Sequence, residues 1–419
     1  MGQYPAPMNH GFHMMTKKFP RQNSATPMLL ILWVLLACLT GCAPEKETPV
    51  QPPPALKKLA KPLYPEFSDT GKKKELVAAL ENSLTYFSRI PSQRKFHFSG
   101  DVYTAGHVRQ SLTTFLEFIQ TGPGNDELNR FIKTNYAVYQ AAGSNDRGEV
   151  LFTGYYEPSI AGSLTRDEQY RFPLYSEPED LLTLDPGLFF DNLQGKALRM
   201  ARVDKNNRVV PYFSRKEINA IEGFEKRAPP IAWLKDRTDR FFLEIQGSGR
   251  LHLKQGGTLR VHYHRKNGHA YRSIGRYLIA QREIPQEQVS MQSIRAWLAD
   301  NPSKAETVFH HNPSFVFFKR EKNGPLGSLG VKVSPMRSIA TDSTLFPKGA
   351  LCFIKTAVPA TTEQKKPWPP YAGFVLNQDT GGAIKGPGRA DFFYGNGDYA
   401  EFAAGRMNHR GALFFLVLE

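Results

Sequence analysis

Three aspartates stand in one glycine-rich stretch of the chain, between Gln378 and Asp398. Asp379, Asp391 and Asp398 are interspersed with six glycines, one lysine and one arginine. Glycine at this density suits neither a helix nor a regular strand, because each glycine costs backbone entropy and offers no side chain to pack. It suits tight turns that bring backbone amides and carboxyl groups close to a ligand. A turn rich in Asp and Gly that binds no ligand is the alternative.

The segments on either side of this stretch predict strands. Apolar residues alternate from Tyr371 to Asn377, and an aromatic run follows from Phe392 to Tyr394. A β-barrel can present a catalytic carboxyl group on a loop between two strands, with acidic residues at the ends of the loop. Asp379-Thr-Gly381 also occurs in aspartic proteases, but those enzymes need two such loops whose carboxyl groups share one proton. The chain has one copy, so we do not favour a protease.

Other residue patterns that could bind a cofactor are incomplete. His262 and His264 alternate on a predicted strand and could face one metal ion, but no acidic or cysteine ligand lies near them in the sequence. The segment Gln246-Gly-Ser-Gly-Arg250 lacks the Lys-Ser/Thr ending of a phosphate-binding loop. It does not match the Gly-x-Ser-x-Gly pattern of a nucleophile elbow either. We therefore expect no cofactor, and activity that requires neither metal nor nucleotide.

The length and charge set broad limits on the class of protein. The chain has 419 residues, enough for two domains, and 31 prolines with 34 glycines favour strands and loops over long helices. Its formal net charge of +15 would suit nucleic acid, an anionic membrane surface or an acidic polymer.

The N-terminus narrows this choice. The basic residues from Lys17 to Arg21 precede an apolar run over 28–39, which is short for a membrane span and typical of a secretory signal. Leu39-Thr-Gly-Cys42 resembles a bacterial lipoprotein box, so we expect cleavage of residues 1–41 and a lipid on Cys42. Ala43 after the cysteine favours the outer membrane, on the periplasmic side. An uncleaved anchor helix is the alternative; nucleic acid is not an expected partner.

The rest of the chain reads as a tether followed by mixed and then β-rich segments. Residues 42–64 are rich in proline and lysine and predict an extended tether. Cys352, in an apolar run, is expected to be a buried thiol. Helices are predicted over 73–87, 107–119 and 128–139, and strands near 151–158, 241–246, 258–263, 312–318 and through 325–419.

Aromatic residues beside glycines and polar side chains recur in four clusters. Flat aromatic faces with nearby hydrogen-bonding groups suit sugar rings, whose faces are apolar and whose edges carry hydroxyl groups. Packing of aromatic residues in turns is the alternative for each cluster by itself. The clusters are Phe152–Pro158, Pro211–Glu217, Ile245–Arg250 and Asn267–Arg276.

Five motifs, taken in order, resemble one family. They are Phe152-Thr-Gly-Tyr-Tyr-Glu-Pro158, Ile245-Gln-Gly-Ser-Gly249, Lys266-Asn-Gly-His-Ala-Tyr-Arg-Ser-Ile-Gly275, Asn312-Pro-Ser-Phe-Val-Phe-Phe318 and Asp379-Thr-Gly-Gly-Ala-Ile-Lys-Gly386. Over residues 65–419 the chain is similar to the membrane-bound lytic murein transglycosylase A family, whose C-terminal segment is named for three aspartates.

The resemblance implies a mainly β fold with some α-helix. A double-psi β-barrel would combine residues 65–160 and 320–419, and a smaller β domain, 161–319, would be inserted between them. A groove between the two would hold a peptidoglycan strand. The family cleaves the β-1,4 bond between N-acetylmuramic acid and N-acetylglucosamine without water, leaving 1,6-anhydromuramoyl ends.

The resemblance also implies roles for single residues. Asp391 would be the one general acid and base, because the C6 hydroxyl of the substrate replaces the second carboxylate of ordinary glycosidases. Burial should raise its pKa. Asp379 would orient the site, with Lys385 and Arg389 as partners for it or for substrate. The residues expected to contact substrate are Thr153, Tyr155, Tyr156, Gln246, Ser248, Lys385, Arg389 and Asp398.

Two other functions fit the same residues. A peptidoglycan-binding lipoprotein without activity could use the same groove, although the presence of Asp391 favours an enzyme. A glycan hydrolase on the same barrel is the second alternative. Product analysis separates the three, because a lyase leaves anhydro ends, a hydrolase leaves reducing ends, and a binding protein leaves the polymer intact.

The lipoprotein box generates a prediction. Cys42→Ser removes the thiol that would carry the lipid, so metabolic labelling of the chain with palmitate should be lost and the protein should become soluble or stay unprocessed. Labelling that persists in the variant would contradict the lipoprotein interpretation.

Overall fold

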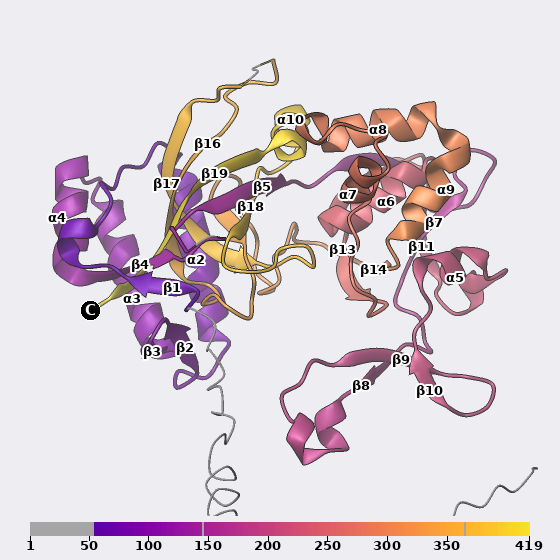
Figure 1. The fold of residues 1–419 in the computed structure, drawn as a ribbon, viewed down its shortest axis with the longest axis horizontal. Coiled ribbons are helices and arrows are strands. Elements are labelled where there is room, and N and C mark those ends of the chain that lie inside the picture. Colours follow the sequence, from indigo (N-terminus) through magenta and orange to yellow (C-terminus); the bar gives the residue numbers. More distant parts are fainter. Residues whose placement is uncertain (1–53, 145, 364–365) are drawn as a thin grey trace, which may run out of the picture. The chain divides into compact units, whose positions relative to one another are not determined.

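Six strands close into a β-barrel in the computed structural model, which describes residues 54–144, 146–363 and 366–419 (Figure 1). The order around the barrel is β19-β16-β17-β15-β18-β5, and β5 completes it by pairing with β19 as well as with β18. The strands are β5 (Val150–Tyr155), β15 (Ser338–Ala340), β16 (Leu351–Ala357), β17 (Pro370–Asp379), β18 (Arg389–Phe393) and β19 (Asn408–Leu418). The expected fold class, mainly β with some α, is confirmed. Cys42 lies outside the described residues.

The long barrel strands are apolar along most of their length because they are covered on both faces. In β16 every residue except Lys355 is buried. The ring of Phe353 lies 5.0 Å from that of Phe67 and 5.0 Å from that of Phe374, which ties the strand to its neighbour β17 and to the N-terminal segment. Cys352 is buried in the same strand, as predicted.

Helices and two further strands extend the barrel at its N-terminal side. The strands β4 (Tyr136–Ala141) and β1 (Leu56–Lys58) add to β19, and the hairpin of β2 (Lys95–Phe98) and β3 (Asp101–Thr104) is separate. The helices there are α2 (Lys73–Ser88), α3 (Ala105–Gln120) and α4 (Asn125–Asn135). Helix α10 (Asp398–Arg406) lies elsewhere, beside β5 and α8 (Met291–Asp300) (Figure 1). None of the helices in the described part of the chain is both long and apolar enough to cross a membrane.

The first two predicted helices are confirmed, and the third is wrong at its end. The helix predicted over 128–139 stops at Asn135, and Tyr136 begins strand β4. The aromatic and β-branched residues that follow suit a strand, and β19 supplies the pairing partner for them. Tertiary pairing therefore decides a segment that local spacing leaves ambiguous.

The segment between β5 and β15 forms a sheet of its own, covered by helices (Figure 1). The sheet order is β14-β13-β12-β6-β11-β7. Its strands are β6 (Ser159–Ser163), β7 (Phe172–Tyr175), β11 (Pro230–Leu234), β12 (Ser248–Leu253), β13 (Thr258–Lys266) and β14 (Val316–Arg320). The helices are α5 (Arg215–Ala220), α6 (Arg237–Gln246), α7 (Ile274–Ala280), α8 (Met291–Asp300) and α9 (Pro302–His311).

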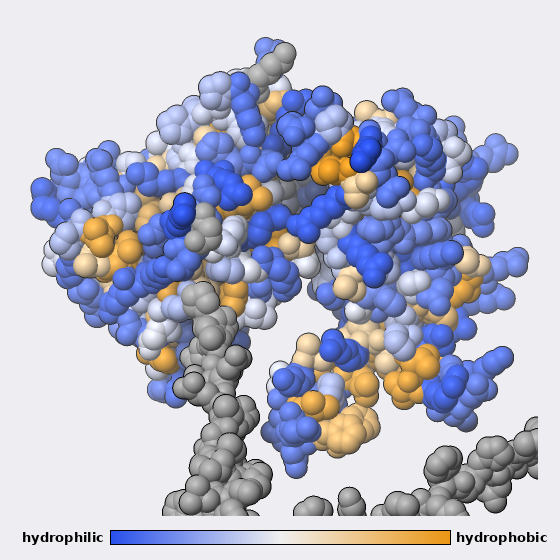
Figure 2. Space-filling view, in the orientation of Figure 1, coloured by the Kyte–Doolittle hydropathy of each residue, from blue (hydrophilic) through white to orange (hydrophobic). Residues whose placement is uncertain are grey.

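A small three-stranded sheet lies within this insertion. It consists of β8 (Leu182–Leu184), β9 (Arg199–Val203) and β10 (Val209–Pro211). Much of the exposed apolar surface gathers on these strands and on the segment between β8 and β9, where Figure 2 shows orange side chains among blue ones. The large exposed apolar residues there are Leu182, Leu188, Phe189, Phe190, Leu198, Val203 and Val209.

The strand predicted over 241–246 is wrong, because the segment is the second half of helix α6. Asp236 caps the start of the helix, accepting a 2.6 Å hydrogen bond from the backbone N–H of Thr238. Gly247 ends the helix with φ of 77°, a left-handed conformation that glycine adopts without strain. A short apolar run fits either a strand or a buried helix, and these two end signals identify it as a helix.

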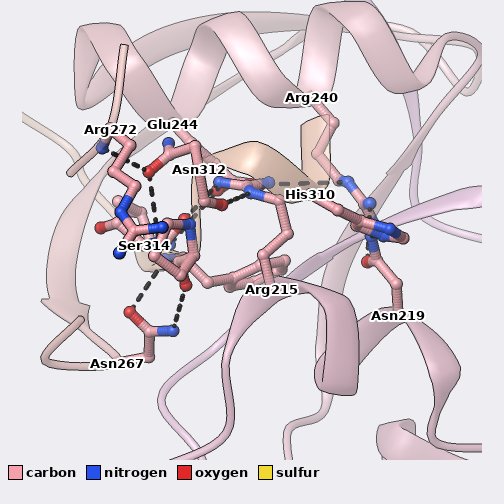
Figure 3. Close-up of polar contacts among 12 residues, drawn as sticks. Arg215, Asn219, Arg240, Glu244, Asn267, Arg272, His310, Asn312 and Ser314 are labelled. Carbon is pink, nitrogen blue, oxygen red and sulfur yellow. Dashed lines mark hydrogen bonds and ion pairs between the residues drawn. The ribbon is translucent and has the colours of Figure 1, made fainter. Parts of the chain in front are cut away.

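A buried ion pair joins α5 to α6 inside the insertion (Figure 3). The guanidinium of Arg215 donates to the carboxylate of Glu244 at 2.6 Å and 3.3 Å, and the side chains are 2% and 1% exposed. Arg215 also donates to the backbone carbonyls of Asn312 at 3.0 Å and Ser314 at 2.6 Å. One buried arginine thus holds two helices against the segment that leads into β14.

Removal of one partner of this pair should be costly. Glu244→Ala leaves the Arg215 charge buried without its counterion, which costs about 3–5 kcal/mol of unfolding free energy. Glu306→Ala is a matched control, because that carboxylate is 47% exposed and pairs with Arg237 at the surface. The control should cost at most about 1 kcal/mol in urea unfolding. Equal losses in the two variants would contradict the importance of the buried pair.

Candidate active site

Strand register brings two of the three aspartates into one row across the barrel. Asp391 on β18 stands opposite Thr153 on β5 and opposite Ala340 on β15. Ala340 in turn stands opposite Asp379 on β17. Neighbouring strands lie about 4.8 Å apart, so the α-carbons of the two aspartates are about 10 Å apart, with their side chains close enough to interact.

A register shift places Asp379 in this row. The pairing of β15 with β17 moves from Asn377 directly to Asp379, which leaves Gln378 as the extra residue. The buried amide of Gln378 donates to the backbone carbonyl of Ala79 at 2.7 Å and accepts from the Ser338 hydroxyl at 2.6 Å. Helix α2 therefore fixes the shift, and the shift aims the next side chain at the site.

Asp379 is held by backbone amides. One of its carboxylate oxygens accepts from the N–H of Ser328 and from the N–H of Thr380, each at 2.8 Å. Burial raises the pKa of this carboxyl to about 6, although these N–H groups act to lower it. Lys385 and Arg389 contact Asp342 and Thr153 rather than Asp379, and their expected contact with substrate stays a prediction.

Asp391 is half-buried in the middle of β18 and has a hydroxyl partner. The hydroxyl of Thr153 donates to one carboxylate oxygen of Asp391. Arg389 Nη2 donates to the same Thr153 oxygen at 3.1 Å. Burial raises the pKa of Asp391 to about 6, Arg389 opposes the rise, and the charge of Asp379 adds to it. The raised pKa agrees with the expectation from sequence.

Two tyrosines lie near the carboxyl groups. The buried Tyr155 hydroxyl falls outside hydrogen-bond geometry with every described group, yet it lies close to Asp379. Burial and both carboxylates raise its pKa well above the ordinary value. Tyr271 comes from the loop between β13 and α7, and burial raises its pKa with a smaller contribution from Asp391. A Cβ added to Gly382 would lie 4.0 Å from the Tyr271 Cβ, so this tyrosine also adjoins the glycine-rich loop.

A fourth aspartate shapes the glycine-rich loop. Asp342 is 4% exposed, accepts from the N–H of Gly386 at 3.0 Å and pairs with Lys385 Nζ at 3.5 Å. Burial acts to raise the Asp342 pKa, but hydrogen bonds from Gly386 and Thr344 bring it below its ordinary value. The exposed Lys385 is therefore tied to the loop base.

Sequence reasoning missed Asp342, Ser328 and Tyr271 as residues of this site. Tyr271 stands in one of the aromatic, glycine and polar clusters, which was the signal that could have identified it. Asp342 and Ser328 lie outside every motif, and the strand pairings alone bring them to the loop.

The remaining expected substrate residues have different surroundings. Gln246 Oε1 accepts from the backbone N–H of Tyr156 at 3.0 Å, which links the end of α6 to the end of β5. Tyr156 is 3% exposed, and Ser248 is 8% exposed at the start of β12. Asp398 is exposed as the first residue of α10, apart from the row that contains the other two aspartates.

The described residues contain no group of three or more His, Cys, Asp and Glu side chains placed to hold a metal ion. His264 Nε2 lies 2.6 Å from the carboxylate of Glu177. Burial, reinforced by the charge of Lys319, lowers the pKa of His262 to about 4.

This arrangement is suited to proton transfer. Asp391 has a pKa near 6, so both of its protonation states are accessible near neutral pH. The hydroxyl of Thr153 supports the ionised form, and the nearby Asp379 charge favours the protonated form. The two carboxyl groups interact, so their titration belongs to the pair.

The raised pKa values generate a prediction about stability and pH. A carboxyl group with a pKa of about 4 in the unfolded chain and about 6 in the folded chain stabilises the fold at low pH, and that contribution is lost as pH rises from 4 through 6. Asp391→Asn cannot ionise, so above pH 7 it should be more stable than wild type by up to ~3 kcal/mol, with the difference fading toward pH 4. Thermal unfolding across pH 4–8 tests this, with exposed Asp398→Asn as the control. A variant less stable than wild type at pH 8 would contradict it.

Two family models match the chain, one over the insertion and one over the C-terminal part of the barrel. Residues 151–319 match the family described as the MltA specific insert domain, and residues 337–417 match the 3D domain. Membrane-bound lytic murein transglycosylase A of Escherichia coli K12 is 32% identical over 305 residues, covering 72% of this chain and 73% of that protein.

Solved structures are similar to a larger share of the chain. The crystal structure of a membrane-bound lytic murein transglycosylase from Agrobacterium tumefaciens has a TM-score of 0.72 at 27% identity, covering 87% of this chain and 98% of that one. The structure of E. coli MltA with bound chitohexaose has a TM-score of 0.64 at 26% identity, covering 88% and 95%.

The matched regions include the residues that build the site. Asp379 and Asp391 fall in the 3D domain match, and Thr153 and Gln246 fall in the insert-domain match. The resemblance seen in five sequence motifs is thus confirmed by both comparisons. The chain belongs to the membrane-bound lytic murein transglycosylase A family.

Proposed function

We propose that this protein cleaves peptidoglycan as a lytic transglycosylase, with Asp391 as the single general acid and base. The observation that carries the proposal is the half-buried Asp391 carboxyl, with a pKa near 6, bonded to Thr153 in a row with Asp379. The names of the relatives support the substrate, and so does the sugar oligomer bound to one structural neighbour. The bond cleaved would be the β-1,4 link between N-acetylmuramic acid and N-acetylglucosamine.

The reaction needs one carboxyl group because the substrate supplies its own nucleophile. Protonated Asp391 donates its proton to the glycosidic oxygen as the bond from that oxygen to muramic acid C1 breaks. The resulting carboxylate then removes the proton of the C6 hydroxyl as that oxygen bonds to C1. The products are a free N-acetylglucosamine hydroxyl and a 1,6-anhydromuramoyl end, and Asp391 regains its proton without any water being consumed.

The neighbours of Asp391 have opposite effects on its two forms. The charge of Asp379 adds to the rise of the Asp391 pKa and so increases the fraction of the acid that is protonated for the first step. Thr153, itself hydrogen-bonded to Arg389, donates to the carboxylate that forms. Because Asp379 is fixed by two backbone amides, its charge stays at one position throughout.

The proposal also covers the domain boundaries, the substrate groove and the membrane anchor. The parallel pairing of β5 with β18 and of β15 with β17 supports a double-psi barrel over 65–160 and 320–419, with 161–319 inserted. A groove between the two would hold the glycan against the expected substrate residues, including Gln246 at the junction. A lipid on Cys42 would hold the enzyme at the periplasmic side of the outer membrane, consistent with relatives named membrane-bound.

Substitution of the acid tests the mechanism. Asp391→Asn keeps size and much of the hydrogen bonding but cannot transfer the proton, so turnover on purified sacculi should fall by about 10²–10⁴-fold. Asp379→Asn should lose less, because it removes only a charge from the surroundings, and exposed Asp398→Asn should lose least. Mass spectrometry of released muropeptides measures the rate and the chemistry together.

Two outcomes would contradict the mechanism, and each points to a different error. Near-normal anhydromuropeptide release by folded Asp391→Asn would mean that another group is the acid. Oxygen from labelled water at muramic acid C1 in wild-type products would mean hydrolysis. Retention of the polymer without any products would favour the alternative of a binding protein.

A further inference from the structure

A cavity of about 310 Å³ lies between the small three-stranded sheet and the loop that follows β13. Its apolar lining is aliphatic and includes Leu184, Met200, Val209 and Pro211, and its polar lining includes Arg199 and His269. The volume is in the range of small-ligand sites. None of these residues belongs to the carboxyl row described above.

The loop that forms one wall of the cavity is fixed in place. His269 Nε2 hydrogen-bonds with the backbone carbonyl of Tyr212 at 2.7 Å. Gly268 has φ of 85° and packs so closely on β9 that an added Cβ would lie 2.6 Å from the Met200 Cβ. The amide of buried Asn267 donates to the backbone carbonyls of Phe213 at 2.8 Å and Pro313 at 2.9 Å. Residues 267–269, which form this wall, are therefore held in place by contacts with other segments of the insertion.

The same loop extends to the glycine-rich loop that precedes the proposed catalytic acid. Tyr271, which adjoins Gly382 and whose pKa is raised in part by the charge of Asp391, is two residues beyond His269, and two residues span at most ~7 Å. The next residue, Arg272, donates its backbone N–H to the Asn312 side chain at 3.1 Å, which pins this end of the loop as well (Figure 3). A ligand attached to substrate at Asp391 could extend along this loop into the cavity.

The lining favours a peptide over a sugar. Sugar rings bind flat aromatic faces and several hydrogen-bonding side chains, whereas the apolar lining of this cavity is aliphatic. Its polar side chains Asn267 and His269 already hydrogen-bond with backbone carbonyls, which leaves the guanidinium of Arg199 for a ligand. Aliphatic walls accept small side chains such as the methyl group of alanine, and a guanidinium binds a carboxylate. Stem peptides of peptidoglycan offer both groups, and they hang from muramic acid, the sugar at the proposed cleavage point.

We propose that this cavity binds the stem peptide attached to the muramic acid at the cleaved bond, with Arg199 contacting a peptide carboxylate. The proposal rests on the proposed function and specifies its substrate: glycan that carries peptides. An extended peptide of four residues spans about 13 Å, enough to enter the cavity from a sugar held near Tyr271.

Two variants of the full chain test the cavity. Val209→Trp fills it from a side chain that is 56% exposed, and Arg199→Gln removes the guanidinium from an exposed strand position. Arg208→Gln is the matched control, since this exposed arginine in the turn between β9 and β10 pairs with Asp204 and is not part of the cavity lining. The substrates are glycan strands with their stem peptides and the same strands stripped of peptide by an amidase.

Wild type should act on peptide-bearing strands with a higher kcat/KM than on stripped strands. Val209→Trp and Arg199→Gln should raise KM for peptide-bearing strands about tenfold, which corresponds to 1.4 kcal/mol, and leave stripped strands unaffected. Arg208→Gln should match wild type on both. Isothermal titration with a soluble muramyl tetrapeptide should show binding to wild type and none to Val209→Trp.

The outcomes separate this proposal from the proposed function. Equal effects of the cavity variants on both substrates, or no effect on either, would overturn the stem-peptide site while leaving the transglycosylase activity standing. Wild type that releases no product from either substrate would overturn the proposed function and this proposal together.

Discussion

The parallel pairing of β5 with β18 is the contact on which the site depends. It joins residues 238 positions apart in the sequence, so that the Thr153 hydroxyl meets the Asp391 carboxylate. The same strand β5 also pairs with β19 and so closes the barrel. Closure and chemistry therefore share one strand, and a change that shifts β5 by one residue would turn Thr153 to the opposite face.

The insertion depends on a different kind of constraint. Helices α5 and α6 and the segment that leads into β14 meet at the buried pair Arg215 and Glu244 (Figure 3). The side chains of Asn267 and Asn312 hold the adjacent loops by hydrogen bonds to their backbone. A buried ion pair stabilises weakly compared with apolar packing, but it tolerates few alternative arrangements, since a displaced partner leaves a charge unsolvated. We consider its role here to be the definition of loop geometry, because Tyr271 and the cavity wall both belong to the loop that it supports.

The local parts of the site could be predicted from sequence, and the parts that depend on register could not. Asp379 and Asp391 stand in a glycine-rich motif whose composition alone indicates a loop with acids at its edges. Nothing in the sequence shows that Gln378 is an extra residue in β17, although that shift decides where Asp379 points. Likewise Lys385 is as close in sequence to Asp379 as to any other acid, but its partner Asp342 comes from another segment.

The fold itself divides in the same way. Alternation and helical spacing predicted β17, α2 and β13, whose patterns are long enough to be distinctive. The short apolar run in α6 fits strand alternation and helical spacing equally well. The cap at Asp236 and the left-handed Gly247 are the features that identify it as a helix. The end of α4 was decided by a partner strand that lies far away in the chain.

The position of β19 has a consequence for how the chain folds. This strand, residues 408–418, lies between β4 and β16 and also pairs with β5. Strands from both halves of the chain therefore need β19 to complete their pairing. Pairings of such long sequence separation form slowly, because the entropy of closing a large loop must be lost before any contact stabilises the ends. Strands β4 and β5 lack their β19 partner until residues 408–418 have been made. The barrel therefore cannot close before β19 has been synthesised, and until then the unpaired edges of β4, β5 and β16 are open to aggregation.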